Sequence, residues 1–492
     1  MTGALPYAFA KTHGALIEAI GGEHASLVVR RDAAWPAIAE IRRHLGLPLH
    51  LTRVDDAAFA ARLAEAYGGG DGNAAEIAAD IGQEVDIDRL MTELPPVEDL
   101  LESQDDAPII RLINALLTQA VREGASDVHI EPYERHSVVR LRRDGVLCDI
   151  ARPHRGLHGA MASRIKIMAS LDIAEKRLPQ DGRIALRLAG RQIDVRVSTL
   201  PTTHGERLVL RLLDKGSGLL GLAELGMDGP TRARFAELLA RPHGILLVTG
   251  PTGAGKSTTL YAALQTLDAD ALNIVTVEDP VEYDLPGVAQ IQANARIDLD
   301  FARALRAILR QDPDVIMIGE IRDLETAQIA VQASLTGHLV LATLHTNDAA
   351  AAVTRLLDMG IEPFLLASTL RGVLAQRLVR RLCPDCREAH AAGDGERRHL
   401  GAGAPPSLWR ARGCPACAGT GYRGRSGIYE LIAFDEAAAA LVRDGAGEKA
   451  LRDHARRHGM PGLRDDGRRL LADGTTSLDE LLRSADAEEA GA

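Results

Sequence analysis

A glycine-rich loop between an apolar strand and a helix constrains this chain more than any other feature. The run Ile245–Val248 predicts a buried strand, and Thr258–Leu264 predicts the helix that follows the loop. The segment has the pattern G-x-x-x-x-G-K-[ST] and comprises Gly250, Pro251, Thr252, Gly253, Ala254, Gly255, Lys256, Ser257 and Thr258. Such glycines let the backbone curl so that N–H groups point at phosphate oxygens, and the helix N-terminus adds partial positive charge. We expect Lys256 to reach the β- and γ-phosphates of a nucleoside triphosphate, and Ser257 to ligate Mg²⁺.

The length and composition of the chain limit what else it can be. At 492 residues it is too long for one core, and about two to four domains are expected. A net charge of −11 and an aromatic content of 3% disfavour a protein that tracks nucleic acid, because such proteins use basic grooves and stacking aromatic side chains. Charged residues interrupt the first twenty positions, so no signal peptide is expected, and no apolar run is long enough to span a membrane. We therefore expect a cytosolic protein.

Pattern changes along the chain predict its organisation. The expected parts are a docking domain (1–90), an acidic linker (91–107), a mixed α+β domain (108–214), a hinge (215–226), a nucleotide domain (227–382), a cysteine-bearing insertion (383–427), a helical subdomain (428–484) and a disordered tail (485–492). Strands and helices alternate in the nucleotide domain. This alternation predicts the α/β fold class, with a parallel sheet covered by helices on both faces.

Acidic residues follow two further apolar runs of the nucleotide domain. The run Val315–Ile318 predicts a strand that carries Glu320 to the edge where the phosphate loop lies. Many such proteins have an aspartate at the end of this strand, whereas this chain has Gly319 there. We expect Glu320 to hold the water shell of Mg²⁺; the alternative is an edge carboxylate paired with Arg322.

The second acidic motif follows the run Ile274–Val277. Hydrolysis needs a group that orients or deprotonates the attacking water, and a carboxylate within hydrogen-bond reach can do so. Glu278 is the first candidate for this role, and Glu282 is the second.

Two histidines flank the apolar run Leu339–Ala342. A histidine at a strand end can hydrogen-bond the γ-phosphate and report its loss, although a lone histidine is more often structural. In the company of the other motifs, His338 and His345 are predicted to sense the γ-phosphate.

Together these motifs resemble the type II secretion and type IV pilus family of motor ATPases. The resemblance extends from Gly124 to the tail, and besides the loop it is carried by Gly124–Pro132, Leu178–Arg183, Ile308–Asp314 and Gly419–Arg425. The N-terminal segment Leu5–Lys11 and the compact first domain look more like the type II secretion ATPase than a pilus ATPase. One departure is Asp298, where the family usually has glycine.

The resemblance implies a RecA-like ATPase domain that follows a PAS-like middle domain. It implies a protein-secreting ATPase that works as a homohexamer with ATP, Mg²⁺ and a structural Zn²⁺, without nucleic acid. The first domain would bind the cytoplasmic part of a bitopic inner-membrane protein, and a polytopic platform protein would be a further partner. The motor would lie on the cytoplasmic face of the inner membrane and drive pseudopilus assembly. The alternatives are a pilus-extension ATPase, a nucleic-acid translocase, and a scaffold that binds ATP without turnover.

Four of the five cysteines form two C-x-x-C pairs that are separated by 27 residues: Cys383 and Cys386, then Cys414 and Cys417. This pattern indicates a structural tetrathiolate zinc site in a cytosolic protein, where disulfides are disfavoured. Cys148, which stands apart, is expected to be a small core residue.

Arginines of the middle domain are predicted to complete the active site of a neighbouring subunit. A hairpin turning at Ala189-Gly190 would place Arg183 directly opposite Arg196, with apolar residues on the other face. Like charges directly opposed in a sheet are destabilising, and a bound triphosphate between them would remove the difficulty. The family resemblance adds Arg207 and Arg211 to this group. The alternative is a set of solvated surface arginines.

Overall fold

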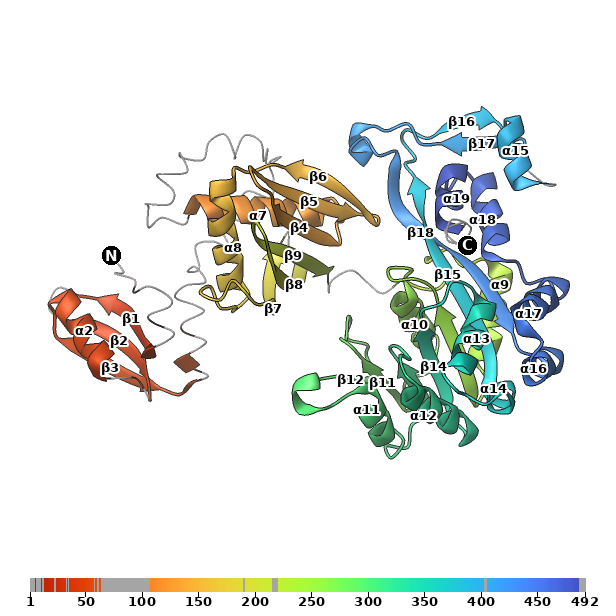
Figure 1. Cartoon of the computed structure of the whole chain (residues 1–492), viewed down its shortest axis with the longest axis horizontal. Helices are drawn as coiled ribbons and strands as arrows, with labels where there is room; N and C mark the ends of the chain where they lie inside the picture. Colours follow the sequence, from red (N-terminus) through yellow and green to blue (C-terminus); the bar gives the residue numbers. More distant parts are fainter. Residues whose placement is uncertain are drawn as a thin grey trace. The chain divides into compact units, whose positions relative to one another are not determined.

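The computed structural model describes residues 5, 10, 13–21, 24–31, 33, 35–56, 58–59, 62, 107–188, 191–214, 220–401 and 405–485. The chain divides into two compact units, Met1–Ser217 and Gly218–Ala492, which we describe separately (Figure 1). The expected acidic linker up to residue 106, the hairpin turn at 189–190 and the tail after Ala485 lie outside the described residues.

The N-terminal part of the first unit is a small sheet with one helix. Its elements are β1 (Ala15–Ile20), β2 (Ala25–Arg30), α2 (Trp35–Leu45) and β3 (Leu49–Val54). β1 pairs antiparallel with β2, and α2 is the crossover that lets β3 pair parallel with β2. Leu27 and Val29 of β2 pack against Ile38 and Ile41 of α2. The strands expected near residues 27–29 and 49–51 are thus present.

The middle part of the first unit is an antiparallel six-stranded sheet. Its elements are α7 (Ala107–Arg122), β4 (Asp127–Pro132), β5 (Ser137–Arg143), β6 (Val146–Ala151), α8 (Arg155–Met168), β7 (Gln180–Leu188), β8 (Arg191–Thr202) and β9 (Gly205–Asp214). The strand order is β6-β5-β4-β9-β8-β7. Apolar residues of one sheet face form a core with α7 and α8, which both lie on that face (Figure 1).

The polar face of this sheet results from the strict alternation of its strands. Ile184 pairs with Val195 on the helix-covered face, and so Arg183 and Arg196, one position away, lie on the other. The prediction for Cys148 is wrong: it lies half-buried on β6, which is an edge strand of the sheet.

The second unit is built on a seven-stranded sheet with the order β12-β11-β13-β14-β10-β15-β18. Its strands are β10 (Gly244–Thr249), β11 (Ile274–Glu278), β12 (Val288–Gln292), β13 (Val315–Ile318), β14 (Leu339–Leu344), β15 (Leu370–Leu382) and β18 (Tyr422–Ala433). The first six strands in this order are parallel, whereas β18 runs antiparallel to β15.

Helices cover both faces of this sheet and confirm the α/β fold class. On one face, Leu246 and Val248 pack with α9 (Gly229–Leu239) and α10 (Lys256–Leu264). On the other face, Leu247 belongs to the core that includes α11 (Phe301–Ile308), α12 (Leu324–Leu335), α13 (Ala349–Asp358) and α14 (Pro363–Thr369). Because β10 is buried on both sides, its sequence is a continuous apolar run without alternation.

The C-terminal third of the chain differs from the expected division. The insertion contains β16 (Glu388–Ala391), α15 (Asp394–Leu400), β17 (Ser407–Arg410) and η2 (Pro415–Cys417). The helical part contains α16 (Glu436–Arg443), α17 (Gly447–Arg457), α18 (Leu463–Ala472) and α19 (Leu478–Ala485). The boundary expected between residues 427 and 428 falls inside β18, which pairs with β15 from Tyr422 to Ala433. The insertion and the helical part are therefore both continuous with the main sheet, because the single strand β18 spans the boundary expected between them.

Asp298 has the backbone conformation that glycine adopts most easily. It follows η1 (Ala295–Ile297) with a φ of 55°, in the left-handed region. Two backbone hydrogen bonds between Asn294 and Leu299 close the loop around it. The loop thus has the shape for which glycine is suited, although this chain has an aspartate there.

None of the helices in the described ranges is long and apolar enough to cross a bilayer.

Candidate nucleotide-binding site

The phosphate loop joins the end of β10 to the start of α10. Gly250, Gly253 and Gly255 have φ values of 149°, 79° and 87°, which residues with side chains rarely adopt. A Cβ atom on Gly250 would lie 2.5 Å from the carbonyl oxygen of Gln376 on β15. The glycines are therefore required by the curl of the loop and by the close approach of the neighbouring strand.

Lys256 is the first residue of α10, and its side chain turns back toward this loop. Its Nζ donates to the carbonyl oxygens of Gly250 at 2.8 Å and Pro251 at 3.1 Å, and lies 3.3 Å from His345 Nδ1. Burial lowers the pKa of Lys256 to about 8, and the Glu320 carboxylate opposes this shift. The ammonium group thus sits in a desolvated position beside the loop, where negative phosphate oxygens would favour its charged form.

His345 and Glu320 extend this cluster. His345 follows β14, and its Nε2 lies 2.9 Å from Glu320 Oε1. The other carboxylate oxygen of Glu320 accepts from Arg322 Nε at 2.8 Å, so the pairing considered as an alternative is present and engages one oxygen. Burial and the Lys256 charge lower the pKa of His345. The structure therefore brings together Lys256, Glu320 and His345, which the sequence places on three separate segments.

His338 is not part of this cluster. It precedes β14, and its carbonyl oxygen accepts from Gly244 N at the first residue of β10, the end of β10 opposite the loop. Its Nδ1 lies 2.8 Å from the carbonyl oxygen of Ala333. A six-residue strand spans about 20 Å. His338 thus lies at the end of the strands opposite the phosphate loop, and its role as a sensor of the γ-phosphate stays a prediction.

Glu278 ends β11 and is held by three hydrogen-bond donors. One oxygen accepts from Thr276 Oγ1 at 2.6 Å and from Gln290 Nε2 at 3.0 Å, and the other accepts from the hydroxyl of Tyr261. The residue is only 4% exposed. These three bonds satisfy the buried carboxylate and fix its orientation.

Tyr261 links Glu278 directly to the helix that follows the phosphate loop. It lies on α10, and burial, followed by its hydrogen bond to Glu278, raises the pKa of its hydroxyl. The same hydroxyl oxygen accepts from the backbone N–H of Glu282 at 3.2 Å. Sequence reasoning missed Tyr261, because a tyrosine in an apolar helix is usually a core residue.

Gly319 explains why the usual strand-end aspartate is missing from this chain. A Cβ atom at this position would lie 3.2 Å from the carbonyl oxygen of Val277 and 3.3 Å from the Cα of Glu278. The backbone after β13 thus passes close to Glu278, and the acidic side chain is supplied one residue later by Glu320.

Two further residues that were not predicted hold the loop in place. The buried Gln376 of β15 donates from Nε2 to the carbonyl oxygen of Ala254 at 2.6 Å. The hydroxyl of Thr249, at the end of β10, lies 2.7 Å from that of Thr346 and accepts from the Thr346 backbone N–H at 3.0 Å. These bonds fix the loop against β15 and against the segment that carries His345.

The four paired cysteines converge at the end of β15. The distances between sulfur atoms are 3.9 Å for Cys383 and Cys414, 3.9 Å for Cys386 and Cys417, and 3.7 Å for Cys414 and Cys417. Four thiolates at a Zn–S distance of about 2.3 Å in a tetrahedron lie about 3.8 Å apart. Burial raises the pKa of Cys417, but backbone N–H groups of Cys414 and Gly421 outweigh it and lower the pKa to about 6. The donor set therefore fits Zn²⁺, and the long insertion folds outward as the β16–β17 hairpin.

The predicted pairing in the middle domain is confirmed. Arg183 lies opposite Arg196, and Arg196 in turn lies opposite Arg211 of β9. Arg211 donates to Asp127 Oδ1 at 2.9 Å, and Arg207 lies 2.7 Å from Glu131 Oε1. The acidic residues of the motif at 124–132 thus pair with two of the four arginines.

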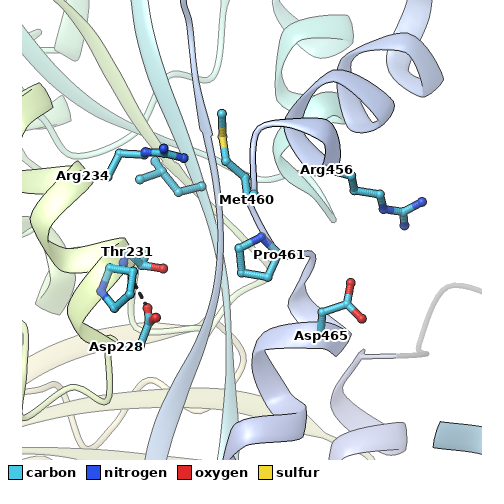
Figure 2. Close-up of a pocket in the computed structure, with 10 residues that line it drawn as sticks. Asp228, Thr231, Arg234, Arg456, Met460, Pro461 and Asp465 are labelled. Atoms are coloured by element: carbon cyan, nitrogen blue, oxygen red, sulfur yellow. Dashed lines mark hydrogen bonds between the residues drawn. The ribbon is translucent and has the colours of Figure 1, made fainter. Parts of the chain in front are cut away.

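A cavity of about 600 Å³ lies elsewhere in the second unit, between α9, β18 and the connection from α17 to α18 (Figure 2). Its charged lining residues are Asp228, Arg234, Arg456 and Asp465. No residue of the phosphate loop and none of the paired cysteines lines it. The candidate site is therefore the loop and its neighbours at the sheet edge, and not this cavity.

Comparisons with known proteins identify the family. Residues 102–483 match the family described as type II/IV secretion system protein. The chain belongs to this family. Residues 4–67 match the model of an N-terminal domain of GSPII protein E. The family resemblance inferred from the motifs is thus confirmed.

Relatives of this family cover nearly the whole chain. The chain is 61% identical to the type II secretion system protein HxcR of Pseudomonas aeruginosa, over 97% of this chain and 98% of the relative. It is 54% identical to the type II secretion system ATPase E of Vibrio cholerae, over 93% and 92% of the two chains. These names favour the secretion branch of the family over the pilus branch.

Solved structures share the fold. The pilus retraction motor PilT with bound ADP is 26% identical, with a TM-score of 0.52 over 76% of this chain and 97% of that chain. The ATPase DotB of Legionella pneumophila is 21% identical, with a TM-score of 0.57 over 78% of this chain and 96% of that chain, and it shows the fold alone.

The hydrogen bond from Tyr261 to Glu278 generates a first prediction. Tyr261→Phe removes one of the three donors that hold the carboxylate of Glu278. We therefore expect kcat for ATP hydrolysis to fall about tenfold, which is a part of the ~10²–10⁴-fold rate enhancement that a positioned acid or base contributes. KM for ATP should change less than about twofold. Steady-state kinetics measures both constants. Tyr422→Phe is the control, because it removes a hydroxyl that bonds Ser477 outside the site. A kcat equal to that of the parent protein would exclude a positioning role for Tyr261.

The cysteine geometry generates a second prediction. Protein purified without chelator should hold one zinc ion per chain at this site that resists mild chelation, and Cys383→Ser should lose it. This variant should destabilise the insertion, while an assembled nucleotide domain keeps its nucleotide affinity. Elemental analysis and nucleotide titration measure the two effects, and Cys148→Ser is the control that keeps its zinc. An absence of stoichiometric zinc in the parent protein would contradict the assignment.

Proposed function

We propose that this chain is the ATPase motor of a type II secretion system, which couples ATP hydrolysis to pseudopilus assembly and protein export. The observation that carries the proposal is the meeting of Lys256, His345 and Glu320 beside a complete phosphate loop. The family match and the full-length relatives named for type II secretion support it.

The loop supplies the binding half of the mechanism. N–H groups of its curled backbone and the N-terminus of α10 would hold the phosphates of ATP. On binding, Lys256 Nζ would exchange the carbonyl oxygens of Gly250 and Pro251 for phosphate oxygens. Ser257 and Glu320 would hold Mg²⁺, directly and through water. The metal ion, when bound, would neutralise the charge that develops on the transferred phosphoryl group.

Glu278 and His345 supply the hydrolytic half. Glu278, held in place by its three donors, would orient or deprotonate the attacking water, with Glu282 as the second candidate. His345 bridges Lys256 and Glu320, so a change at the γ-phosphate would alter both of its contacts. Tyr261 then ties the position of Glu278 to that of the loop helix.

Assembly and location complete the proposal. Homohexamers would place Arg183, Arg196, Arg207 and Arg211 of one subunit at the nucleotide of the next. The first domain would bind the cytoplasmic part of a bitopic inner-membrane protein, and a polytopic platform protein would receive the motion. The match of residues 4–67 to an N-terminal domain of GSPII protein E supports this docking role and peripheral attachment on the cytoplasmic side.

The assignment of Lys256 and Glu320 is tested by substitution. Lys256→Ala should lose most nucleotide affinity, because it removes the charge that holds the β- and γ-phosphates. Glu320→Gln should retain nucleotide binding, but its turnover rate should fall by at least about 100-fold, because loss of the carboxylate charge disorders the water shell of Mg²⁺. Nucleotide titration and phosphate release measure the two effects. Glu325→Gln, an exposed carboxylate on α12 that pairs with Arg306, is the control. Parental turnover in Glu320→Gln would show that its role is misassigned.

The shared site is tested with mixed subunits. Arg183→Ala and Arg196→Ala should each lower turnover by ~10³-fold or more, as for arginine fingers, and leave ATP binding nearly intact. Mixing either with Lys256→Ala should restore part of the activity, because some interfaces then combine two intact halves. Arg152→Ala, an exposed arginine paired with Asp149, is the control. Mixtures that co-assemble without recovery would argue against a shared site, and full activity in both single variants would exclude the role.

A further inference from the structure

Three side chains with metal-binding atoms meet between α16 and α17, apart from the cysteine cluster. Asp435 is the residue before α16, His454 lies on α17, and His458 follows the last residue of α17. One ligand atom from each lies within 4.8 Å of the other two. The four-residue spacing of the histidines places them one turn apart on the same side of the helix.

The distances within this group suit a transition metal. His454 Nε2 lies 3.1 Å from one oxygen of Asp435 and 3.2 Å from the other. Ligands about 2.0–2.1 Å from a tetrahedral zinc ion lie about 3.3 Å apart. The rings of His454 and His458 pack against each other, with centroids 4.1 Å apart and an angle of 34° between their planes.

Neighbouring backbone groups already orient two of the three side chains. His458 Nδ1 lies 2.8 Å from the carbonyl oxygen of His454, to which it can only donate, so in the neutral imidazole the Nε2 lone pair is available to a metal ion. The Asp435 carboxylate accepts from the backbone N–H of Ala438 at 2.8 Å. Such outer bonds fix the tautomer and orientation of metal ligands.

We propose that Asp435, His454 and His458 form a second metal site, which binds Zn²⁺ or a similar divalent transition ion. Two imidazoles and one carboxylate suit zinc, cobalt, nickel and copper, whereas Mg²⁺ and Ca²⁺ prefer oxygen ligands alone. Three protein ligands leave at least one coordination position for water or for a donor of a partner. His454 is buried, whereas Asp435 and His458 are exposed.

A bound ion would join the start of α16 to the end of α17. Ordinary structural contacts account for the three side chains one by one: Asp435 caps α16, His454 bonds Asp435, and His458 bonds the carbonyl oxygen of His454 and packs on its ring. None of these contacts uses the ligand atoms of all three side chains together, although these atoms lie within 4.8 Å of one another. A metal ion uses all three side chains.

The test uses the full-length chain without a polyhistidine tag. After mild chelation, Co²⁺ should bind with one equivalent per chain and give the weak absorption of nitrogen and oxygen ligands, without the thiolate charge-transfer band of a cysteine site. His458→Ala should weaken this binding at least about tenfold, since even indirect supports of metal ligands contribute that much. Because His458 is exposed, this variant should fold, and circular dichroism checks that it does.

A matched variant distinguishes metal binding at this site from weak binding to scattered surface histidines. His399 is exposed on α15 and belongs to no metal-ligand group among the described residues. His399→Ala should bind Co²⁺ with parental affinity, and Asp435→Asn should weaken binding as His458→Ala does. Equal affinity in the parent and in His458→Ala, equal losses in His458→Ala and His399→Ala, or no binding in the parent would each overturn the proposal.

Discussion

The candidate site depends on the parallel pairing of β10, β13 and β14. In parallel strands the carboxyl ends meet at one edge, and here that edge receives the phosphate loop, Glu320 and His345. Lys256 Nζ is the point where these segments meet, because it contacts the loop carbonyls and His345 and feels the charge of Glu320. Helices on both faces make the sheet rigid, so a small cluster of polar side chains keeps a defined geometry in spite of its partial exposure.

The parts of this arrangement that were predictable from sequence are those encoded locally. The phosphate loop has a fixed spacing between a strand and a helix, and the two cysteine pairs have the spacing of zinc ligands. The pairing of Arg183 with Arg196 followed from a short hairpin, since turn length and strand alternation together determine the register. Glu320 and His345 follow apolar runs, and the carboxyl ends of parallel strands meet by geometry alone.

The parts that could not be predicted depend on contacts between distant segments. Tyr261 reaches Glu278 from α10, which packs over β10 and β14, and Gln376 reaches the loop because β15 lies beside β10. The sequence shows neither arrangement. His338 was assigned because it flanks a predicted strand in the company of the other motifs, but His338 and His345 lie at opposite ends of β14, and only His345 lies at the end near the loop. The boundary within β18 was missed because the glycine-rich start of that strand resembles a loop, whereas its pairing with β15 makes it a strand.

The charges of the middle domain bear on what this motor can bind. The row Arg183, Arg196 and Arg211 continues across the sheet to Asp127 and Arg142, which lie opposite each other on β4 and β5. Arg207 is likewise paired with the buried Glu131. A nucleic-acid groove needs positive charge along many phosphates, whereas Asp127 and Glu131 place negative charge beside several arginines of this face. Within this row the cross-strand neighbours of Arg183 and Arg196 are arginines. This arrangement supports the proposed contact with a compact, highly charged anion such as the triphosphate of ATP, while a net charge of −11 for the whole chain disfavours a nucleic-acid backbone as a partner.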